Sequence, residues 1–123
     1  MKVELQGPLE PILIYVTCPD MELAKAIARV LLEQRLIACA NILPQMQSIY
    51  SWQGEIKEDS EVVLLLKTRQ DLSPDVTQKV VSLHSYDCPA VLEIPLRGGH
   101  PEFLAWIQAE TESKKTNGGT DDD

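Results

Sequence analysis

The chain has 123 residues, and its 44% hydrophobic content is typical of a single globular domain with a core of its own. Its formal net charge is −8 at pH 7 and its eleven basic residues are scattered, with only Lys114 and Lys115 adjacent, which argues against nucleic-acid binding, because that function needs Lys and Arg gathered in a patch. No apolar run reaches the ~18 residues of a membrane helix, and residues 1–10 lack the basic end and apolar stretch of a secretion signal, so we expect a cytoplasmic protein without a membrane partner.

The first expected elements are a strand and a helix. Residues 11–17 form a β-rich apolar run that ends at Cys18-Pro19-Asp20. Asp20 can cap the helix that follows, because apolar residues recur at helical spacing from about Met21 to Gln34. The domain therefore begins as a strand that leads into one amphipathic helix, and residues 1–10 precede it as an N-terminal extension.

Residues 38–68 predict an unusually long β-hairpin. Its tightest point is Gln53-Gly54, and Pro44 marks a bulge in an edge strand, because proline cannot donate a hydrogen bond to a neighbouring strand. Each arm would be about 40 Å long, whereas the preceding helix covers only about 21 Å. The outer half of the hairpin therefore favours pairing with another copy of the chain. We expect the residues near the tip, Ile49, Tyr50 and Trp52, to lie in that interface between copies.

The second half of the chain predicts a helix, a turn, a strand and a short final helix. Ser73-Pro74 is a helix start, with a capping hydroxyl and a proline at the first helical position. Residues 84–89 break this helix, residues 90–95 form a strand, and residues 100–107 form the final helix. Residues 111–123 are polar, acidic and rich in glycine, so we expect a disordered acidic tail.

The order strand, helix, strand, strand, helix, strand is the split β-α-β pattern of ferredoxin-like folds. The predicted fold class is therefore α+β, with one domain over residues 11–110. The first and third strands are central in this topology, and residues 12–16 and 62–66 are the two near-continuous apolar runs. The sequence has no phosphate-binding loop, nucleophile elbow or helical zinc motif, so we expect no enzymatic activity and no required cofactor.

The three cysteines form no close pairs and are odd in number, which argues against a disulfide framework. Cys18, Cys39 and Cys88 are each interpreted first as small buried apolar residues, Cys39 beside the first helix. Cys39 is also open to interpretation as a metal ligand or a nucleophile, although a mid-strand thiol has no helix end to activate it. His84 either caps the end of its helix or binds a ligand, and His100 is expected to be exposed.

Several segments together resemble the CutA family of divalent-cation tolerance proteins, in the right order and spacing over about residues 11–110. They are Thr17-Cys18-Pro19-Asp20, Ala38-Cys39-Ala40-Asn41, Pro44, Ser48-Ile49-Tyr50-Ser51-Trp52-Gln53-Gly54, Lys67-Thr68, His84-Ser85-Tyr86-Asp87-Cys88-Pro89 and Phe103-Leu104-Ala105-Trp106-Ile107. The resemblance implies a ferredoxin-like fold assembled as a PII-like homotrimer, in which long ribbons wrap neighbouring subunits. It also implies a role in tolerance of, or response to, copper and other divalent metals.

On this resemblance, Cys39 and His84 are the expected metal ligands, and thiolate and imidazole suit copper better than calcium or magnesium. The alternative function is a PII-like small-molecule sensor or partner-docking module. Its ligand would occupy clefts between subunits, near Lys67, Tyr86 and Asp87.

Overall fold

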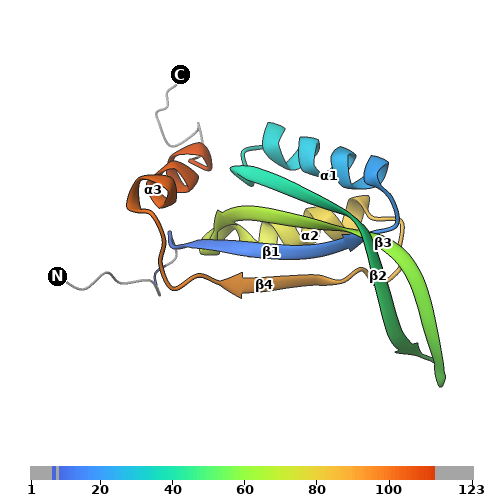
Figure 1. The fold of residues 1–123 in the computed structure, drawn as a ribbon. Helices are drawn as coiled ribbons and strands as arrows, with labels where there is room; N and C mark the ends of the chain where they lie inside the picture. The colour runs from blue at the N-terminus through green and yellow to red at the C-terminus, as the bar shows by residue number, and fades with distance from the viewer. Residues whose placement is uncertain (1–6, 8, 113–123) are drawn as a thin grey trace.

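The computed structural model describes residue 7 and residues 9–112, which form a four-stranded antiparallel sheet with helices packed on it (Figure 1). The strand order is β2-β3-β1-β4. In chain order the elements are β1 (Pro11–Cys18), α1 (Met21–Glu33), β2 (Cys39–Trp52), β3 (Glu55–Arg69), a 3-10 turn (Gln70–Leu72), α2 (Ser73–Leu83), β4 (Val91–Pro95) and α3 (Pro101–Glu110). This arrangement confirms the ferredoxin-like α+β prediction and the central position of the first and third strands.

The hydrophobic core lies between one face of the sheet and the helices α1 and α2. Along β3, Leu64 and Leu66 are fully buried on the helix side, whereas Leu65 points to the other face. Asp20 caps α1 as predicted, because its carboxylate accepts a hydrogen bond from the Leu23 backbone N–H at 2.8 Å. The core residues are Ile12, Ile14, Val16, Cys18, Ala24, Ile27, Ala28, Leu31, Ile37, Val62, Leu64, Leu66, Val76 and Val80.

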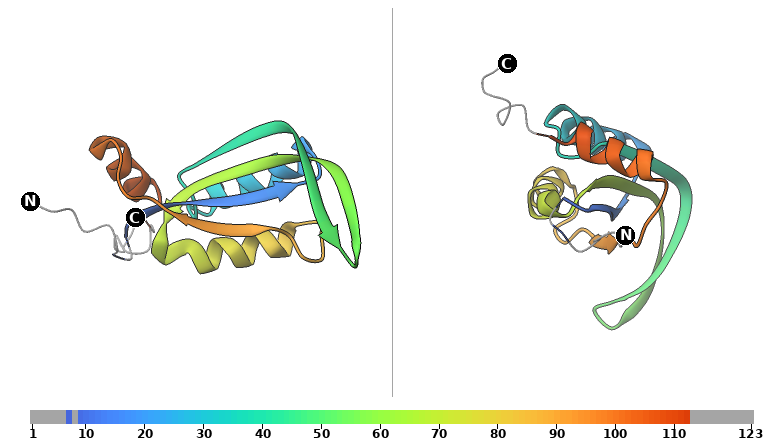
Figure 2. Two further views of the ribbon diagram at one scale, coloured as in Figure 1. Left: turned by 60° about the horizontal axis from the view of Figure 1, so that its bottom comes forward. Right: turned by 90° about the vertical axis from the view of Figure 1, so that its left-hand side faces the viewer.

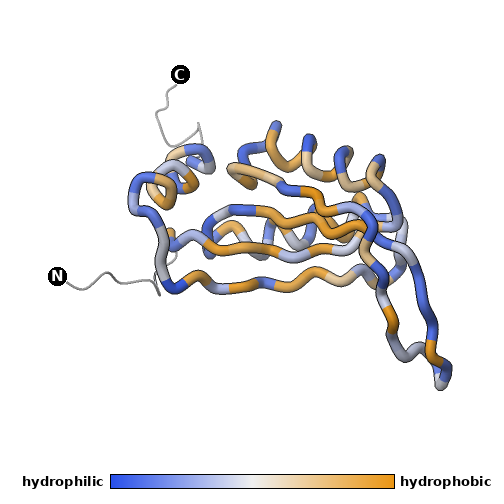
Figure 3. The backbone as a smooth tube through the Cα atoms, viewed as in Figure 1, coloured by the Kyte–Doolittle hydropathy of each residue, from blue (hydrophilic) through white to orange (hydrophobic). Residues whose placement is uncertain are grey.

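The other face of the sheet, which we call the open face, is covered at one end only in the part of the chain that the structure describes. There α3 contacts β3 and β1 and buries Ile107. Elsewhere the strands present apolar side chains, and Leu43 and Leu92 are 51% and 58% exposed. Figure 3 shows apolar segments along all four strands. By strand register, the open-face side chains include Leu13, Tyr15, Leu43, Leu65, Leu92 and Ile94.

The strands β2 and β3 continue past the rest of the sheet as a two-stranded ribbon that curves away from the body of the domain (Figures 1 and 2). β3 pairs with β1 only from Val62 to Arg69. Residues 55–61 therefore extend about 23 Å beyond β1. This geometry confirms that the outer half of the hairpin has no helix layer of its own chain to cover it.

Backbone conformation explains the turn and the bend of the ribbon. Gln53 and Gly54 have φ angles of 51° and 83°, the positive values that a two-residue hairpin turn requires at both central positions. The predicted bulge directly follows Pro44, where the register shifts between Leu43 and Met46. Gln45, the extra residue, has a φ angle of 63°.

Two helix boundaries differ from the prediction. Ser73 does not cap α2, because the 3-10 turn precedes it and Leu72 occupies the capping position without a side-chain hydrogen bond. Thr111, which we assigned to the tail, is 2% exposed and donates its hydroxyl to the Ile107 carbonyl at 2.8 Å. The ordered domain therefore reaches at least Glu112, while residues 1–6, 8 and 113–123 lie outside the described residues, where the extension and the tail stay predictions.

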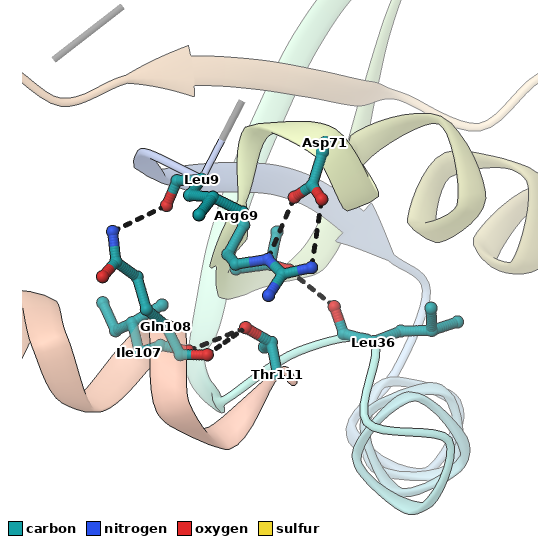
Figure 4. A network of polar contacts seen from close by, with 8 residues as sticks. Leu9, Leu36, Arg69, Asp71, Ile107, Gln108 and Thr111 are labelled. Atoms are coloured by element: carbon teal, nitrogen blue, oxygen red, sulfur yellow. Dashed lines mark hydrogen bonds and ion pairs between the residues drawn. The ribbon is translucent and has the colours of Figure 1, made fainter. Parts of the chain in front are cut away.

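Polar contacts hold α3 against the end of the sheet (Figure 4). The Gln108 side-chain amide donates a hydrogen bond to the Leu9 carbonyl at 2.9 Å, which joins α3 to the segment before β1. Further pairs in this region are Thr111 with the Ile107 carbonyl, Arg69 with Asp71, and Thr68 with the Leu36 carbonyl. The Gln108 hydrogen bond, together with the burial of Ile107, fixes the position of α3, and with it Phe103, relative to the open face.

Candidate functional site

Cys39, the first predicted metal ligand, lies on the open face near α3. It stands directly opposite Lys67 in the β2–β3 pairing, and the Lys67 ammonium is 3.6 Å from its Sγ. The same ammonium donates a hydrogen bond to the Asn41 side-chain oxygen, and the Phe103 ring centroid is 5.7 Å away. The expectation of a thiol packed beside the first helix is therefore wrong, because strand alternation turns Cys39 away from α1.

His84, the second predicted ligand, uses both ring nitrogens inside the fold. Its Nε2 is 2.7 Å from the Thr17 carbonyl oxygen, which can only accept, so Nε2 carries the ring proton. Its Nδ1 accepts a hydrogen bond from the Tyr86 backbone N–H at 3.1 Å. The side chain therefore fixes the turn after α2 onto β1. His84 does occupy the C-cap position of α2, but its backbone N–H makes the capping contact, with the Val80 carbonyl at 2.9 Å, and its ring nitrogens bond elsewhere.

Tyr86 is anchored to a carboxylate at the base of the ribbon. Its hydroxyl donates to Glu61 at 2.7 Å, and Glu61, which is 9% exposed, also accepts from the Ser48 hydroxyl at 2.6 Å. Burial, followed by this hydrogen bond and the Glu61 charge, raises the pKa of Tyr86 well above its usual value. Glu61 thus joins the turn after α2 to both strands of the ribbon. Asp87, the residue after Tyr86, is exposed.

The two predicted metal ligands lie at opposite ends of the sheet within one chain. Cys39 is opposite Lys67, which pairs with Leu13 on β1, whereas His84 contacts Thr17 at the other end of that strand. Leu13 and Thr17 are about 13 Å apart along the strand. Over residue 7 and residues 9–112, no three His, Cys, Asp or Glu side chains are grouped to hold a metal ion.

The predicted cleft residues divide in the same way. Lys67 lies beside Cys39, whereas Tyr86 and Asp87 belong to the turn near Thr17. One chain therefore does not bring these three side chains together. A cleft lined by all of them requires surfaces from more than one subunit.

The remaining cysteines differ sharply in environment. Cys18 is completely buried, and this burial, followed by the charges of Asp20 and Glu61, raises the pKa of its thiol to about 11. It is therefore a protonated, inert core residue at neutral pH, as its first interpretation predicted. Cys88 is exposed, which corrects the same interpretation for that residue, and all three cysteines are free thiols.

The tip of the ribbon is apolar on both faces. Tyr50 and Trp52 share one face, and Trp52 is 50% exposed. Ile49 lies on the other face with Ile56, which is 82% exposed and which the sequence analysis did not single out. The Tyr50 hydroxyl donates to the Asp59 carboxylate, and this hydrogen bond is the main cause of a raised Tyr50 pKa.

Two polar residues at these sites were not predicted as site residues from the sequence. Asn41 follows Cys39 by one strand repeat and so shares its face, a signal that strand alternation alone could have supplied. Glu61 is a carboxylate directly before the apolar run of β3. Its burial depends on the turn after α2 folding back over it, which no local pattern indicates.

Comparison with known proteins matches this architecture. The sequence profile of the CutA1 divalent ion tolerance protein family matches residues 12–110. Protein CutA of Mus musculus is 45% identical over 104 residues, which make up 85% of this chain and 59% of the mouse protein. The chain therefore spans a little over half the length of this curated relative.

Two solved structures cover the domain almost completely. The divalent cation tolerance protein of Thermus thermophilus has a TM-score of 0.81 at 40% identity, over 83% of this chain and 99% of its own. The periplasmic divalent cation tolerance protein CutA of Archaeoglobus fulgidus has a TM-score of 0.81 at 39% identity, over the same shares. These names refer to metal tolerance and to no catalysed reaction.

The matched region contains all of the sheet except Pro11, and all three helices of the described residues. Among the described helices, none combines the length and the apolar content that crossing a membrane requires. The sequence match, the strand order and the long ribbon therefore lead to one conclusion: this chain belongs to the CutA1 divalent ion tolerance protein family.

Proposed function

We propose that this chain acts as a non-enzymatic, cytoplasmic homotrimer that binds a soft metal ion, with copper as the first choice, in divalent-metal tolerance. The observation that carries the proposal is the Cys39 thiol. It is only half-buried on the open face, next to the Asn41 oxygen, in a family named for divalent-cation tolerance. A free thiol in a reducing compartment is a ligand for soft metals.

The apolar surfaces of the single chain support the trimer. The open face presents Leu43 and Leu92, and the ribbon tip presents Trp52 on one side and Ile56 on the other. An isolated two-stranded ribbon is only marginally stable in water. A ribbon that is apolar on both sides therefore needs other parts of a protein packed against both. Neighbouring subunits in a closed ring meet this requirement, because each ribbon then lies against another chain.

The proposed trimer can also supply the donor atoms that the metal site of one chain lacks. Cys39 and Asn41 contribute one sulfur and one oxygen, fewer donors than most copper sites use. In the proposed trimer, donors from a second subunit complete the set. His84 contributes only if one of its two hydrogen bonds, to the Thr17 carbonyl or from the Tyr86 N–H, is given up.

Replacing Cys39 with Ala should reduce copper affinity at least about tenfold, a difference of ~1.4 kcal/mol, because it removes the only soft donor at the site. Native mass spectrometry of the reduced protein, with and without stoichiometric copper, measures the oligomer and its metal content together. The wild type should be a trimer that takes up copper in multiples of three. His84→Ala should reduce uptake less than Cys39→Ala does.

Cys88→Ala is the matched control, since it removes an exposed thiol outside the proposed site. If Cys39→Ala binds copper as well as the wild type does, the metal assignment is wrong. If copper uptake disappears in Cys88→Ala instead, the site belongs to the turn after α2.

A second candidate function, a PII-like sensor or docking module, is favoured by the turn of residues 84–89. His84 and Tyr86 fix this turn to β1 and to Glu61, yet Tyr86 and Asp87 keep exposed surface. A rigid turn with exposed polar groups suits recognition of a small ligand. The ligand would bind between subunits, where Lys67 of another subunit can approach the turn.

A thermal-shift screen of nucleotides and small metabolites tests this second function. A ligand that binds only the folded trimer raises its melting temperature, because it stabilises the folded state by an amount that grows with the ratio of ligand concentration to Kd, and Asp87→Ala should reduce this shift. A library without any stabilising compound would remove the support for a sensor.

A further inference from the structure

One cysteine and one lysine lie side by side on the open face. The Lys67 nitrogen is 3.6 Å from Cys39 Sγ, and the Cys39 side chain is only half-buried. Of the lysines that the structure describes, only Lys67 makes a hydrogen bond to a cysteine. Cys18 is completely buried and Cys88 is exposed. The fold therefore places a thiol that a small solute can reach next to a nitrogen nucleophile.

Strand pairing holds this pair together, and no loop is involved. Lys67 is directly opposite Cys39 in the antiparallel pairing of β2 and β3. Its ammonium donates a hydrogen bond to the Asn41 side-chain oxygen, and the Phe103 ring centroid is 5.7 Å away, within the range of a cation–π contact. These two contacts keep the nitrogen on the same face as the sulfur. Such proximity makes a reaction between the two groups effectively unimolecular.

We propose that Cys39 is a reversible oxidation site at which Lys67 captures the oxidised sulfur in an S–N bond. The oxidant is hydrogen peroxide. The Cys39 sulfur attacks one peroxide oxygen, the O–O bond breaks, and the products are a sulfenic acid and one water. The neutral amine of Lys67 then attacks the sulfur, as a backbone nitrogen does in other sulfenamides. The S–N bond forms, the S–O bond breaks, and the oxygen leaves as a second water.

The S–N bond has two consequences for the protein. It protects the sulfur from irreversible oxidation to sulfinic and sulfonic acids, and it cross-links β2 to β3. Two molecules of a thiol such as glutathione reverse it. The first attacks the Cys39 sulfur, frees the Lys67 amine and forms a mixed disulfide, and the second releases the Cys39 thiol as a disulfide of the two small thiols forms. This chemistry does not depend on the metal binding proposed above.

Intact-mass spectrometry of the folded protein after treatment with hydrogen peroxide tests the proposal. The Cys88→Ser background leaves Cys39 as the only cysteine that is not completely buried. We expect each chain to lose about 2 Da, the mass of two hydrogens, and dithiothreitol to restore the original mass. Tandem mass spectrometry should place the new bond between Cys39 and Lys67. Electrophoresis without reductant identifies any disulfide between two chains, which would also remove two hydrogens.

Lys67→Arg in the same background isolates the role of the amine. It keeps a positive charge beside the sulfur, but a guanidinium stays protonated and does not act as a nucleophile. This variant should gain about 16 Da and then about 32 Da, and the second product should resist dithiothreitol. Lys25→Arg, on the exposed side of α1, is the matched control and should lose about 2 Da as the background protein does. Circular dichroism verifies the fold, and Lys67→Gln gives the same test if Lys67→Arg does not fold.

Four results would overturn the proposal. The first is a loss of about 2 Da that persists in Lys67→Arg, and the second is a stable gain of about 16 or 32 Da while Lys67 is present. The third is a gain of about 14 Da, which would show an oxygen atom between sulfur and nitrogen in place of the direct bond. The fourth is an unchanged mass under conditions that oxidise free glutathione, which would show that peroxide does not react with Cys39.

Discussion

Replacing Trp52 with Asp is expected to convert the proposed trimer into monomers or aggregates, the largest effect of any single substitution. Trp52 is half exposed in one chain, near the tip of a ribbon that no helix of its own chain covers. If the tip is buried against another subunit, an aspartate there places an unpaired charge in an apolar contact. Such burial costs several kcal/mol for each subunit. Native mass spectrometry and sedimentation report the loss of assembly directly.

Leu32→Asp is the control for this substitution. Leu32 is 42% exposed on α1, on the side of the domain away from the open face, and receives the same charge. It should leave the trimer intact. A trimer that survives Trp52→Asp with unchanged stability would contradict the proposed role of the ribbon tip.

Substitutions at two neighbouring leucines distinguish the stability of the folded domain from the stability of its assembly. Leu64 is fully buried between β3 and the helices, so Leu64→Ala should destabilise the protein by ~2–5 kcal/mol, the range for a large cavity in a core. Leu65 lies on the open face. Leu65→Ala should affect the free energy of unfolding of a dilute, dissociated subunit little but should weaken the trimer.

Urea unfolding at several protein concentrations distinguishes these effects, because only association makes the midpoint depend on concentration. Leu64→Ala should lower the midpoint at every concentration. Leu65→Ala should lower the midpoint at high concentration, where the subunits associate, and change it little at concentrations where the subunits are dissociated. Equal effects of both substitutions at all concentrations would show that the open face is not an interface between subunits.

The sequence was sufficient for the architecture because the strongest signals are local. The turn at Gln53-Gly54, the apolar run of β3 and the cap at Asp20 each depend on neighbouring residues alone, and the structure has all three. The predicted start of α2 was wrong. Ser73-Pro74 has the residues of a helix cap, but the 3-10 turn before them makes Leu72 the capping residue, and the sequence does not reveal that turn.

The candidate site was harder to predict because it depends on register and on the path of a turn. Counted back from the tight turn without a bulge, Cys39 would pair with Thr68. The extra residue Gln45 shifts the pairing to Lys67 and so creates the contact between thiol and ammonium. His84 meets Thr17 only because the turn after α2 crosses to β1, which no spacing in the sequence specifies.

The position of the ribbon in the chain has a consequence during synthesis. β2 and β3 emerge from the ribosome before α2 and β4, so the apolar tip is exposed on the nascent chain before the domain is complete. The β3 arm carries Glu55, Glu58 and Asp59 beside that tip. Such charges discourage strands of different nascent chains from pairing wrongly. The acidic arm can thus protect the ribbon until complete subunits meet.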